Sequence, residues 1–201
     1  MSSTAGFSRT TIDLLRHGEA EGGNCFRGAT DDPLTDEGWH QMLRQCEGGQ
    51  WQAVVSSPLG RCASFASAWA EKHQLKVTLD PDWREIDFGE WEGLQAAQID
   101  PEALRRFYAD PNAFTPPKAE SYASFATRIR RAWETLLTRH SGQKVLVVTH
   151  AGVIRGLFSH LLAIPVRQSF QIELPHACLT RFSCFEDAAG RYVQFNFHKP
   201  V

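Results

Sequence analysis

Three short segments rich in β-branched residues are separated along the chain by helical patterns. These segments are residues 10–15 (TTIDLL), 53–56 (AVVS) and 144–149 (KVLVVT), and each precedes a helical pattern or a glycine-rich turn. Short apolar runs of this kind are typical of parallel strands that are buried on both faces. We predict that the three segments form the centre of one sheet.

Apolar residues at helical spacing predict three helices. The first is expected over residues 57–70, with Ser57 as its N-cap and a proline in its first turn. The second covers residues 122–137, and Gly142 lies where a helix stop is expected before the third strand. The third follows His150 and includes residues 153–162.

The C-terminal part of the chain has three further segments with strand character. They are residues 169–174 (SFQIEL), 178–185 (CLTRFSCF) and 191–197 (RYVQFNF), and the last two are expected to form a hairpin around residues 187–190. The alternation of strands and helices predicts an α/β fold, a three-layer α/β/α sandwich with a mostly parallel central sheet. Antiparallel strands are expected near the C-terminus.

The composition is that of one domain with a sizeable core. The 201 residues are 42% hydrophobic and 22% charged, and we expect residues 1–201 to form a single domain. Residues 1–9 are expected to be a flexible tail. Residues 94–120 are the least regular part, contain four prolines, and are a candidate cap or specificity segment. The net charge of −2 and the lack of any basic run argue against a nucleic-acid partner.

The cysteines and the apolar stretches bear on location. Five cysteines, with none in a C-x-x-C spacing, indicate reduced thiols in a cytoplasmic protein. The N-terminal residues lack the apolar region of a secretory signal, and the most apolar later stretch is interrupted by Arg155 and His160. We therefore expect a cytoplasmic protein that has no membrane partner.

Basic residues stand at the carboxyl ends of the three predicted strands. Arg16 and His17 follow the first strand, Arg61 lies just beyond the second, and His150 follows the third. Ligands of open α/β sheets bind at this edge. Arg61 falls in the first turn of a predicted helix and His150 just before one, so helix N-termini would add positive potential. The arrangement predicts a site for a compact anion such as phosphate.

A histidine between two arginines suits attack on phosphorus. Neutral His17 can act as the nucleophile, and the arginines can surround the oxygens of the transferring phosphoryl group without a metal. The leaving alkoxide needs a proton, for which Glu85 is the candidate. Burial against Trp83, Phe88 or Trp91 would favour its protonated form. We therefore predict a phosphatase that needs neither metal nor cofactor.

Other classes of protein fit the sequence less well. Asp80 and Asp82 follow a strand-like segment, as in Mg²⁺-dependent aspartyl-phosphate phosphatases, but Arg84 stands where Thr or Val is required. No cysteine has an arginine six residues later, and the eight histidines show no H-E-x-x-H spacing. A non-catalytic module that binds a phosphorylated ligand would need neither the nucleophile His17 nor the acid Glu85.

Five ordered motifs resemble those of the histidine phosphatase superfamily, also called the phosphoglycerate mutase-like fold. The motifs are LLRHGEA (14–20), GATDDPLTDEG (28–38), VVSSPLGRC (54–62), REIDFGEWEG (84–93) and VVTHAGVIR (147–155). The resemblance covers most of the chain. It implies a small phosphate monoester as substrate and a phosphohistidine as intermediate.

Carried over by position, the resemblance gives the same site residues as the chemistry. It implies that His17 is phosphorylated, that Glu85 donates protons, and that the phosphate is bound by Arg16, Arg61 and His150. It adds Asn24, which matches an asparagine that can reach the phosphate. Two positions depart from the family pattern: Ala20 stands where Thr or Ser is common, and Ala151 replaces the first of two glycines.

Within the family, the chain is most similar to bacterial α-ribazole-5'-phosphate phosphatases, which act in cobalamin biosynthesis. The resemblance lies in the short RGATDDPLT turn, the FGEWEG segment and the connection RRFYADPNAFTPP (105–117). A phosphoglycerate mutase, in which an arginine pair precedes a proline run, and a broad-specificity sugar or nucleotide phosphatase are the alternatives. The oligomeric state is left open.

Overall fold

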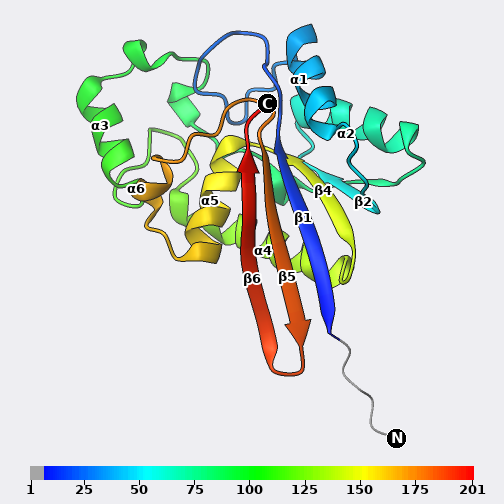
Figure 1. Cartoon of the computed structure of the whole chain (residues 1–201). Helices are drawn as coiled ribbons and strands as arrows, with labels where there is room; N and C mark the ends of the chain where they lie inside the picture. Colours follow the sequence, from blue (N-terminus) through cyan, green and yellow to red (C-terminus); the bar gives the residue numbers. More distant parts are fainter. Residues whose placement is uncertain (1–6) are drawn as a thin grey trace, which may run out of the picture.

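A six-stranded mixed sheet forms the centre of the protein in the computed structural model, which describes residues 7–201 (Figure 1). The strand order is β3-β2-β4-β1-β5-β6, with parallel pairing among the first four strands and antiparallel pairing of β5 with both β1 and β6. The strands are β1 (Ser8–Arg16), β2 (Ala53–Ser56), β3 (Val77–Leu79), β4 (Lys144–Thr149), β5 (Leu179–Asp187) and β6 (Gly190–Lys199). The predicted parallel centre and C-terminal hairpin are confirmed.

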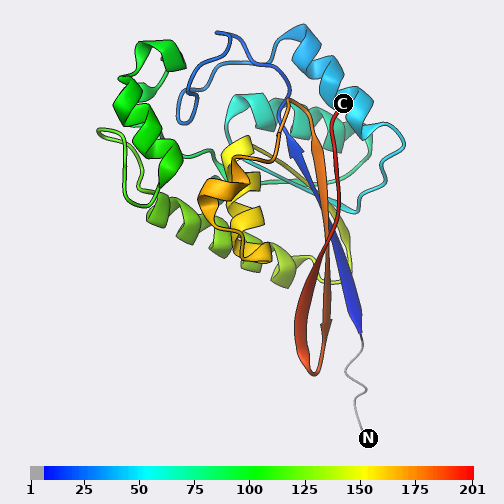
Figure 2. The same cartoon turned by 60° about the vertical axis from the view of Figure 1, so that its left-hand side comes forward.

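Helices cover both faces of the sheet. One apolar cluster joins it to α1 and α2, and another joins its opposite face to α4 and α5, which lie to the left of the sheet in Figure 2. The helices are α1 (Asp36–Cys46), α2 (Gly60–Lys72), α3 (Pro101–Ala109), α4 (Tyr122–Arg139), α5 (Ala151–Leu162) and α6 (Val166–Ser169), with 3₁₀ turns at Pro81–Trp83, Gly89–Trp91 and Ala96–Gln98. The three-layer sandwich is confirmed.

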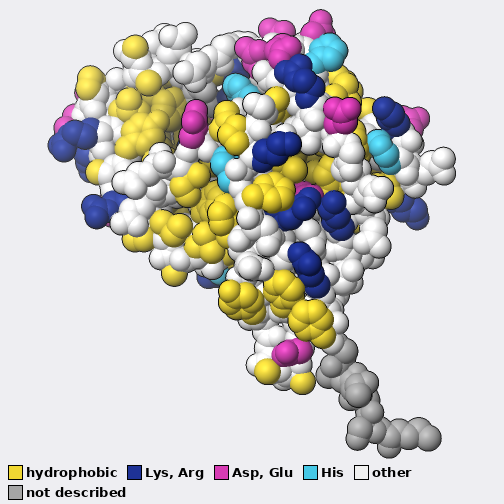
Figure 3. Space-filling view, viewed as in Figure 1, with side chains coloured by type: hydrophobic (Ala, Val, Ile, Leu, Met, Phe, Trp, Pro, Cys, Tyr) yellow, Lys and Arg dark blue, Asp and Glu magenta, His cyan; other side chains and the backbone are white. Residues whose placement is uncertain are grey.

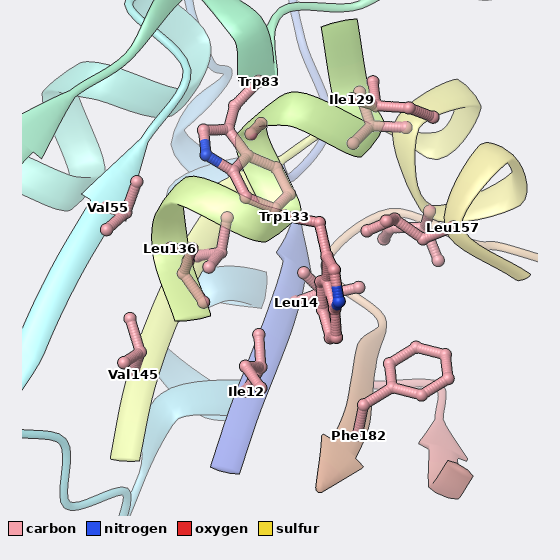
Figure 4. Close-up of a cluster of buried hydrophobic side chains, with 14 of the residues drawn as sticks. Ile12, Leu14, Val55, Trp83, Ile129, Trp133, Leu136, Val145, Leu157 and Phe182 are labelled. Atoms are coloured by element: carbon pink, nitrogen blue, oxygen red, sulfur yellow. The ribbon is translucent and has the colours of Figure 1, made fainter. Parts of the chain in front are cut away.

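The two faces of β4 show why its sequence is apolar at nearly every position. Side chains alternate across a strand, so Val145 and Val147 enter the cluster with Trp133 of α4, while Leu146 and Val148 enter the cluster under α2. Figure 4 shows Val145 in the first of these clusters, with Trp133 among its members. A strand that is covered on both faces has no position at which a polar side chain would reach water.

Residues 169–174 do not form a strand, so that prediction is wrong. Their first residue ends the short helix α6, and turns follow. The carbonyl groups of Ser169 and Ile172 accept hydrogen bonds from the Arg155 side chain instead of from a neighbouring strand. A half-buried guanidinium from α5 therefore takes the acceptors that a sheet would have used.

Two other boundaries differ from the predictions. The helix expected from Ser57 begins at Gly60, because the backbone N–H of Gly60 is capped by the carboxylate of Asp31 from a distant loop (2.7 and 2.9 Å). Strand β1 begins at Ser8, so residues 8 and 9 belong to the sheet and not to a tail. Residues 1–6 of the expected tail lie outside the described residues.

The segment 94–120 contains the helix α3, which lies at the upper left in Figure 1. Its apolar residues form a separate small cluster that includes Trp91, Ile99 and Phe107. Among residues 7–201, no helix combines the length and hydropathy needed to cross a membrane.

Candidate active site

The carboxyl ends of β1 and β4 bring two histidines together. The last residue of β1, Arg16, pairs with Thr149 of β4, and the backbone N–H of His17 donates to the Thr149 carbonyl at 2.9 Å. His17 and His150 therefore leave the sheet side by side, with ring centroids 5.2 Å apart. Parallel neighbours end at the same edge, which is why motifs more than 130 residues apart in sequence meet here.

The environment of His17 leaves one ring nitrogen available as a nucleophile. Burial, and then the charges of Arg16 and Arg61, lower the pKa of His17 well below its usual value, so the ring is neutral at neutral pH. Nδ1 lies 2.8 Å from the carbonyl oxygen of Gly18, and a carbonyl can only accept, so Nδ1 carries the proton. The lone pair is consequently on Nε2.

Two arginines are held in place by backbone carbonyl groups. Arg61 is fully buried and donates to the carbonyls of Thr30 (2.6 Å) and Gly28 (2.9 Å), while Arg16 donates to the carbonyl of Leu174. The Nε atoms of both arginines are buried without a partner among the described residues. Leaving a buried donor unpaired is costly, and an anionic ligand at this position would satisfy such donors.

His150 completes the group beneath the cleft. Its Nε2 lies 2.8 Å from the hydroxyl oxygen of Ser57, and the thiol of Cys62 lies 3.6 Å from the same nitrogen. Burial, and then the charge of Arg61, lower the pKa of His150 well below its usual value. Ser57, expected as a helix N-cap, therefore orients a histidine instead.

Glu85 reaches the site from the loop that follows β3, and it is buried as expected. Its carboxylate accepts from the N–H groups of Gly152 (2.9 Å) and Ile86 (3.0 Å). Burial raises the pKa of Glu85 more than these hydrogen bonds lower it, which favours the protonated acid. A Cβ on Gly152 would lie 2.1 Å from Oε1 of Glu85, whereas Ala151 is accommodated. Only the second of the two family glycines is therefore required here.

An open cleft of about 260 Å³ gives access to these groups. Its walls include Arg16, His17 and Glu85, and Asn24 lies on an exposed loop at its rim. Arg61 and His150 do not line this cleft, because they are fully buried beneath it. The structure therefore brings the sequence-predicted residues to one place, with Asn24 the most exposed of them.

Comparison with known proteins shows which family this constellation represents. A sequence model of the histidine phosphatase superfamily (branch 1) matches residues 12–197. The chain belongs to the histidine phosphatase superfamily. The resemblance of its five ordered motifs to this family is thereby confirmed.

The relatives of this chain carry names that describe different activities. It is 35% identical over 190 residues to the bifunctional protein Rv2228c of Mycobacterium tuberculosis, covering 90% of this chain and 52% of the relative. The chain thus spans about half the length of that relative. It is 32% identical to the probable phosphoglycerate mutase GpmB of Serratia proteamaculans (85% of this chain, 83% of the relative). It is 27% identical to the adenosylcobalamin/alpha-ribazole phosphatase of Escherichia coli (82% and 85%).

A solved structure shares the fold over nearly the whole chain. The native structure of mycobacterial glucosyl-3-phosphoglycerate phosphatase superposes with a TM-score of 0.83 at 26% identity. The match covers 98% of this chain and 100% of that one. The phosphoglycerate mutase-like fold class predicted from the motifs is confirmed.

The candidate site also contains residues that the sequence did not single out. His176, in the loop before β5, places its ring 5.8 Å from that of His17. Burial, and then Arg16 and Arg27, lower the pKa of His176 to about 4. No local pattern marks His176, because it reaches the site only through the pairing of β5 with β1.

Glu92 is the second residue that sequence reasoning missed. Its carboxylate accepts from the N–H groups of Gly28, Ala29 and Thr30 at 3.0–3.1 Å, from the Thr30 hydroxyl at 2.5 Å, and from the Phe88 N–H at 2.9 Å. Burial alone would raise the pKa of Glu92, but these hydrogen bonds together lower it. The loop that it clamps supplies the carbonyls that hold Arg61.

Replacing Glu92 by Gln is expected to weaken phosphate binding. The amide group of Gln would face backbone N–H donors, and each unpaired buried donor costs about 1–3 kcal/mol. The loop that holds Arg61 would loosen. We expect the inhibition constants of inorganic phosphate and vanadate to rise about 10-fold, which corresponds to one such penalty, and kcat/KM to fall equally for good and poor leaving groups.

Glu90→Gln is the matched control for this prediction, because Glu90 lies in the same turn and only pairs with Lys118 at the surface (3.0 Å). Both variants should be assayed below their measured Tm. Unchanged vanadate inhibition in Glu92→Gln would show that the clamp does not position Arg61.

The positions of Asp80 and Asp82 do not support the alternative of a Mg²⁺-dependent aspartyl-phosphate phosphatase. Asp82 is paired with Arg131 through two contacts of 2.6 Å, and Asp80 accepts from the Asp82 N–H at 2.9 Å. Neither residue lines the cleft.

The N-termini of α2 and α5, which were expected to add positive potential for the anion, are engaged by carboxylates. One N–H of α2 binds Asp31, and one N–H of α5 binds Glu85.

Proposed function

We propose that this histidine phosphatase hydrolyses phosphate monoesters through a phosphohistidine on Nε2 of His17. The observation that carries the proposal is the neutral His17 ring with its free Nε2. Burial and the charges of Arg16 and Arg61 lower the pKa of this ring, and each of the two arginines has a buried Nε donor without a partner among residues 7–201. A module that only binds a phosphorylated ligand would use the arginines, but it would have no need for a neutral nucleophile beside a buried acid.

The reaction divides into two displacements. Nε2 of His17 attacks phosphorus, the bond to the ester oxygen breaks, and protonated Glu85 gives its proton to the departing alkoxide. Water then attacks the phosphohistidine while the Glu85 carboxylate accepts a proton from it, and inorganic phosphate leaves. Arg16 and Arg61 stabilise the charge on the equatorial oxygens in both steps.

We propose further that catalysis needs no metal and takes place in the cytoplasm. The charge that Mg²⁺ supplies in other phosphoryl-transfer enzymes can be supplied here by Arg16 and Arg61. All five cysteines are described, and none is paired in a disulfide, in keeping with a reducing compartment. We therefore expect excess EDTA to leave the rate of hydrolysis unchanged. Inhibition by EDTA that Mg²⁺ reverses would instead support the Mg²⁺-dependent mechanism based on Asp80 and Asp82.

As substrate we propose α-ribazole-5'-phosphate, on the strength of the motif resemblance and the aromatic cleft. Phe26, Phe88 and Tyr108 line the cleft. Two further aromatic residues of this region, Trp91 and Phe114, pack against each other in the small cluster beside α3 and do not line it.

The structure favours a phosphatase over a phosphoglycerate mutase. Phosphoglycerate carries a carboxylate that needs its own cation. Arg105 pairs with Glu102 at the surface, and Arg106 lies over the Phe114 ring at 4.7 Å. Neither arginine lines the cleft, which argues against the mutase alternative.

We expect α-ribazole-5'-phosphate to be hydrolysed with a kcat/KM about 100-fold or more above that of 3-phosphoglycerate. Stacking of one base on aromatic side chains is worth about 1–3 kcal/mol. Arg27, a further arginine that lines the cleft, is already paired with Asp32 (2.7 Å), so the carboxylate of the phosphoglycerate would have to compete for it. Phosphate release from both esters, with mutase activity measured in parallel, checks the prediction. Efficient interconversion of phosphoglycerates with no hydrolysis of the ribazole ester would overturn the substrate while leaving the His17 chemistry standing.

A further inference from the structure

A second, apolar cavity lies behind the catalytic cleft. It has a volume of about 150 Å³ and is enclosed by α3, the start of α4, α5 and α6. Its walls are mainly aromatic and aliphatic, and they include Ile86, Phe107, Tyr122, Val166 and Phe170. Hydrophobic side chains also gather on the surface over α3 and α6, at the left of Figure 3. We call this cavity the ring chamber.

The ring chamber and the cleft meet at the proposed proton donor. Glu85 lines both cavities, and so do Phe26, Phe88 and Tyr108. An ester oxygen that receives the proton of Glu85 therefore lies at the boundary between them. The phosphate is then on the side of the arginines, and the carbon attached to the ester oxygen faces the chamber.

The charges around the chamber argue against an ionic occupant. The ionisable residues among its walls are Glu85, two tyrosines and Arg155. Nη1 of Arg155 donates to the carbonyls of Ser169 and Ile172. Its guanidinium also lies over the Phe170 ring at 5.3 Å. Burial lowers the pKa of Arg155 and raises the pKa of Tyr108, so the phenol stays neutral.

We propose that the ring chamber binds a flat, uncharged ring of the leaving group. An engineered apolar cavity of about 150 Å³ in another protein holds a benzene molecule, so the volume suits one such ring, with a linking carbon at the mouth beside Glu85. The proposal rests on the proposed function for the placement of the ester oxygen. It extends that function to esters in which one carbon links a ring to the ester oxygen, which differ from α-ribazole-5'-phosphate, where the ribose separates the base from that oxygen.

Filling the chamber tests the proposal. Benzyl phosphate and ethyl phosphate both release an alkoxide, and only the first carries a ring. Transfer of a ring from water to an apolar site favours binding by about 10- to 100-fold. We expect the wild-type protein to prefer benzyl phosphate by that factor in kcat/KM, and Val166→Phe to remove most of the preference.

Val193→Phe is the matched control, since Val193 is a half-buried residue of β6 that does not line the chamber. It should keep the benzyl preference. Val166→Leu, a smaller enlargement, replaces Val166→Phe if the larger side chain lowers the yield of folded protein. If the ratio of kcat/KM for benzyl phosphate to that for ethyl phosphate is unchanged in the variant at position 166, the proposal that the chamber binds the ring is overturned.

Binding of benzyl alcohol separates this proposal from the proposed function. If the wild-type protein hydrolyses neither of these esters nor α-ribazole-5'-phosphate, the phosphatase function fails, and the ring chamber is then tested by ligand-detected NMR with benzyl alcohol alone. Weaker binding to Val166→Phe than to Val193→Phe supports the chamber. Equal binding to the two variants overturns it.

Discussion

Replacing His17 by Ala is expected to abolish turnover and the covalent phosphoryl label together. The covalent route needs the Nε2 lone pair, and the loss of a nucleophile that acts with its neighbours as one unit costs more than about 10,000-fold in kcat. Rapid quenching in base during turnover of a ³²P-labelled ester should trap an acid-labile, base-stable phosphohistidine in the wild-type protein. The variant should show neither label nor phosphate release.

His176→Ala is the informative control, because the ring of His176 lies 5.8 Å from that of His17. The control should retain a base-stable label, whatever its rate. A label that survives in His17→Ala but disappears in His176→Ala would move the nucleophile to His176. Full activity of His17→Ala would remove the central claim.

Replacing Glu85 by Gln is expected to slow phosphorylation of the enzyme in proportion to the basicity of the leaving group. Gln keeps the shape of the side chain but cannot donate a proton, and general acid catalysis contributes about 100- to 10,000-fold. An alkyl phosphate should show this full loss. p-Nitrophenyl phosphate should show a much smaller loss, because nitrophenolate leaves readily without a proton.

The losses on the two esters should be compared in the first turnover. In later turnovers, hydrolysis of the phosphohistidine, in which Glu85 acts as the base, also limits the rate. Stopped-flow measurement should show a burst of nitrophenolate in Glu85→Gln, followed by slow hydrolysis of the phosphohistidine. The pH profile gives a further readout. Burial raises the pKa of Glu85, so the acid form is lost only as pH rises through that elevated value, and the alkaline fall of alkyl phosphate turnover should disappear in the variant.

Glu90→Gln is again the control, as an exposed carboxylate from the same loop. It should match the wild-type protein for both esters. Equal losses on the alkyl and nitrophenyl esters in the first turnover of Glu85→Gln would show that Glu85 has a role other than proton donation.

The sequence by itself determined the parts of this protein that depend on local pattern and chain order. The apolar strands and the helices between them predict a parallel sheet, and such a sheet places His17, Arg61 and His150 at one edge. Because each strand of a parallel sheet ends at the same edge, the chemistry of these residues could be combined before any distance was known. The neutral His17 ring and the raised pKa of Glu85 agree with that reasoning.

Only the tertiary structure decided the contacts between segments that lie far apart in the chain. Glu92 finds its donors more than 60 residues earlier, and Asp31 caps a helix 29 residues later. The expected strand at residues 169–174 was lost because Arg155 takes its carbonyls. Hydrogen bonds of this kind form only once the sheet and the helices that cover it have assembled. They depend on geometry that no local pattern encodes. For the same physical reason, the walls of the ring chamber come from four helices and two loops, and they could not be identified from spacing alone.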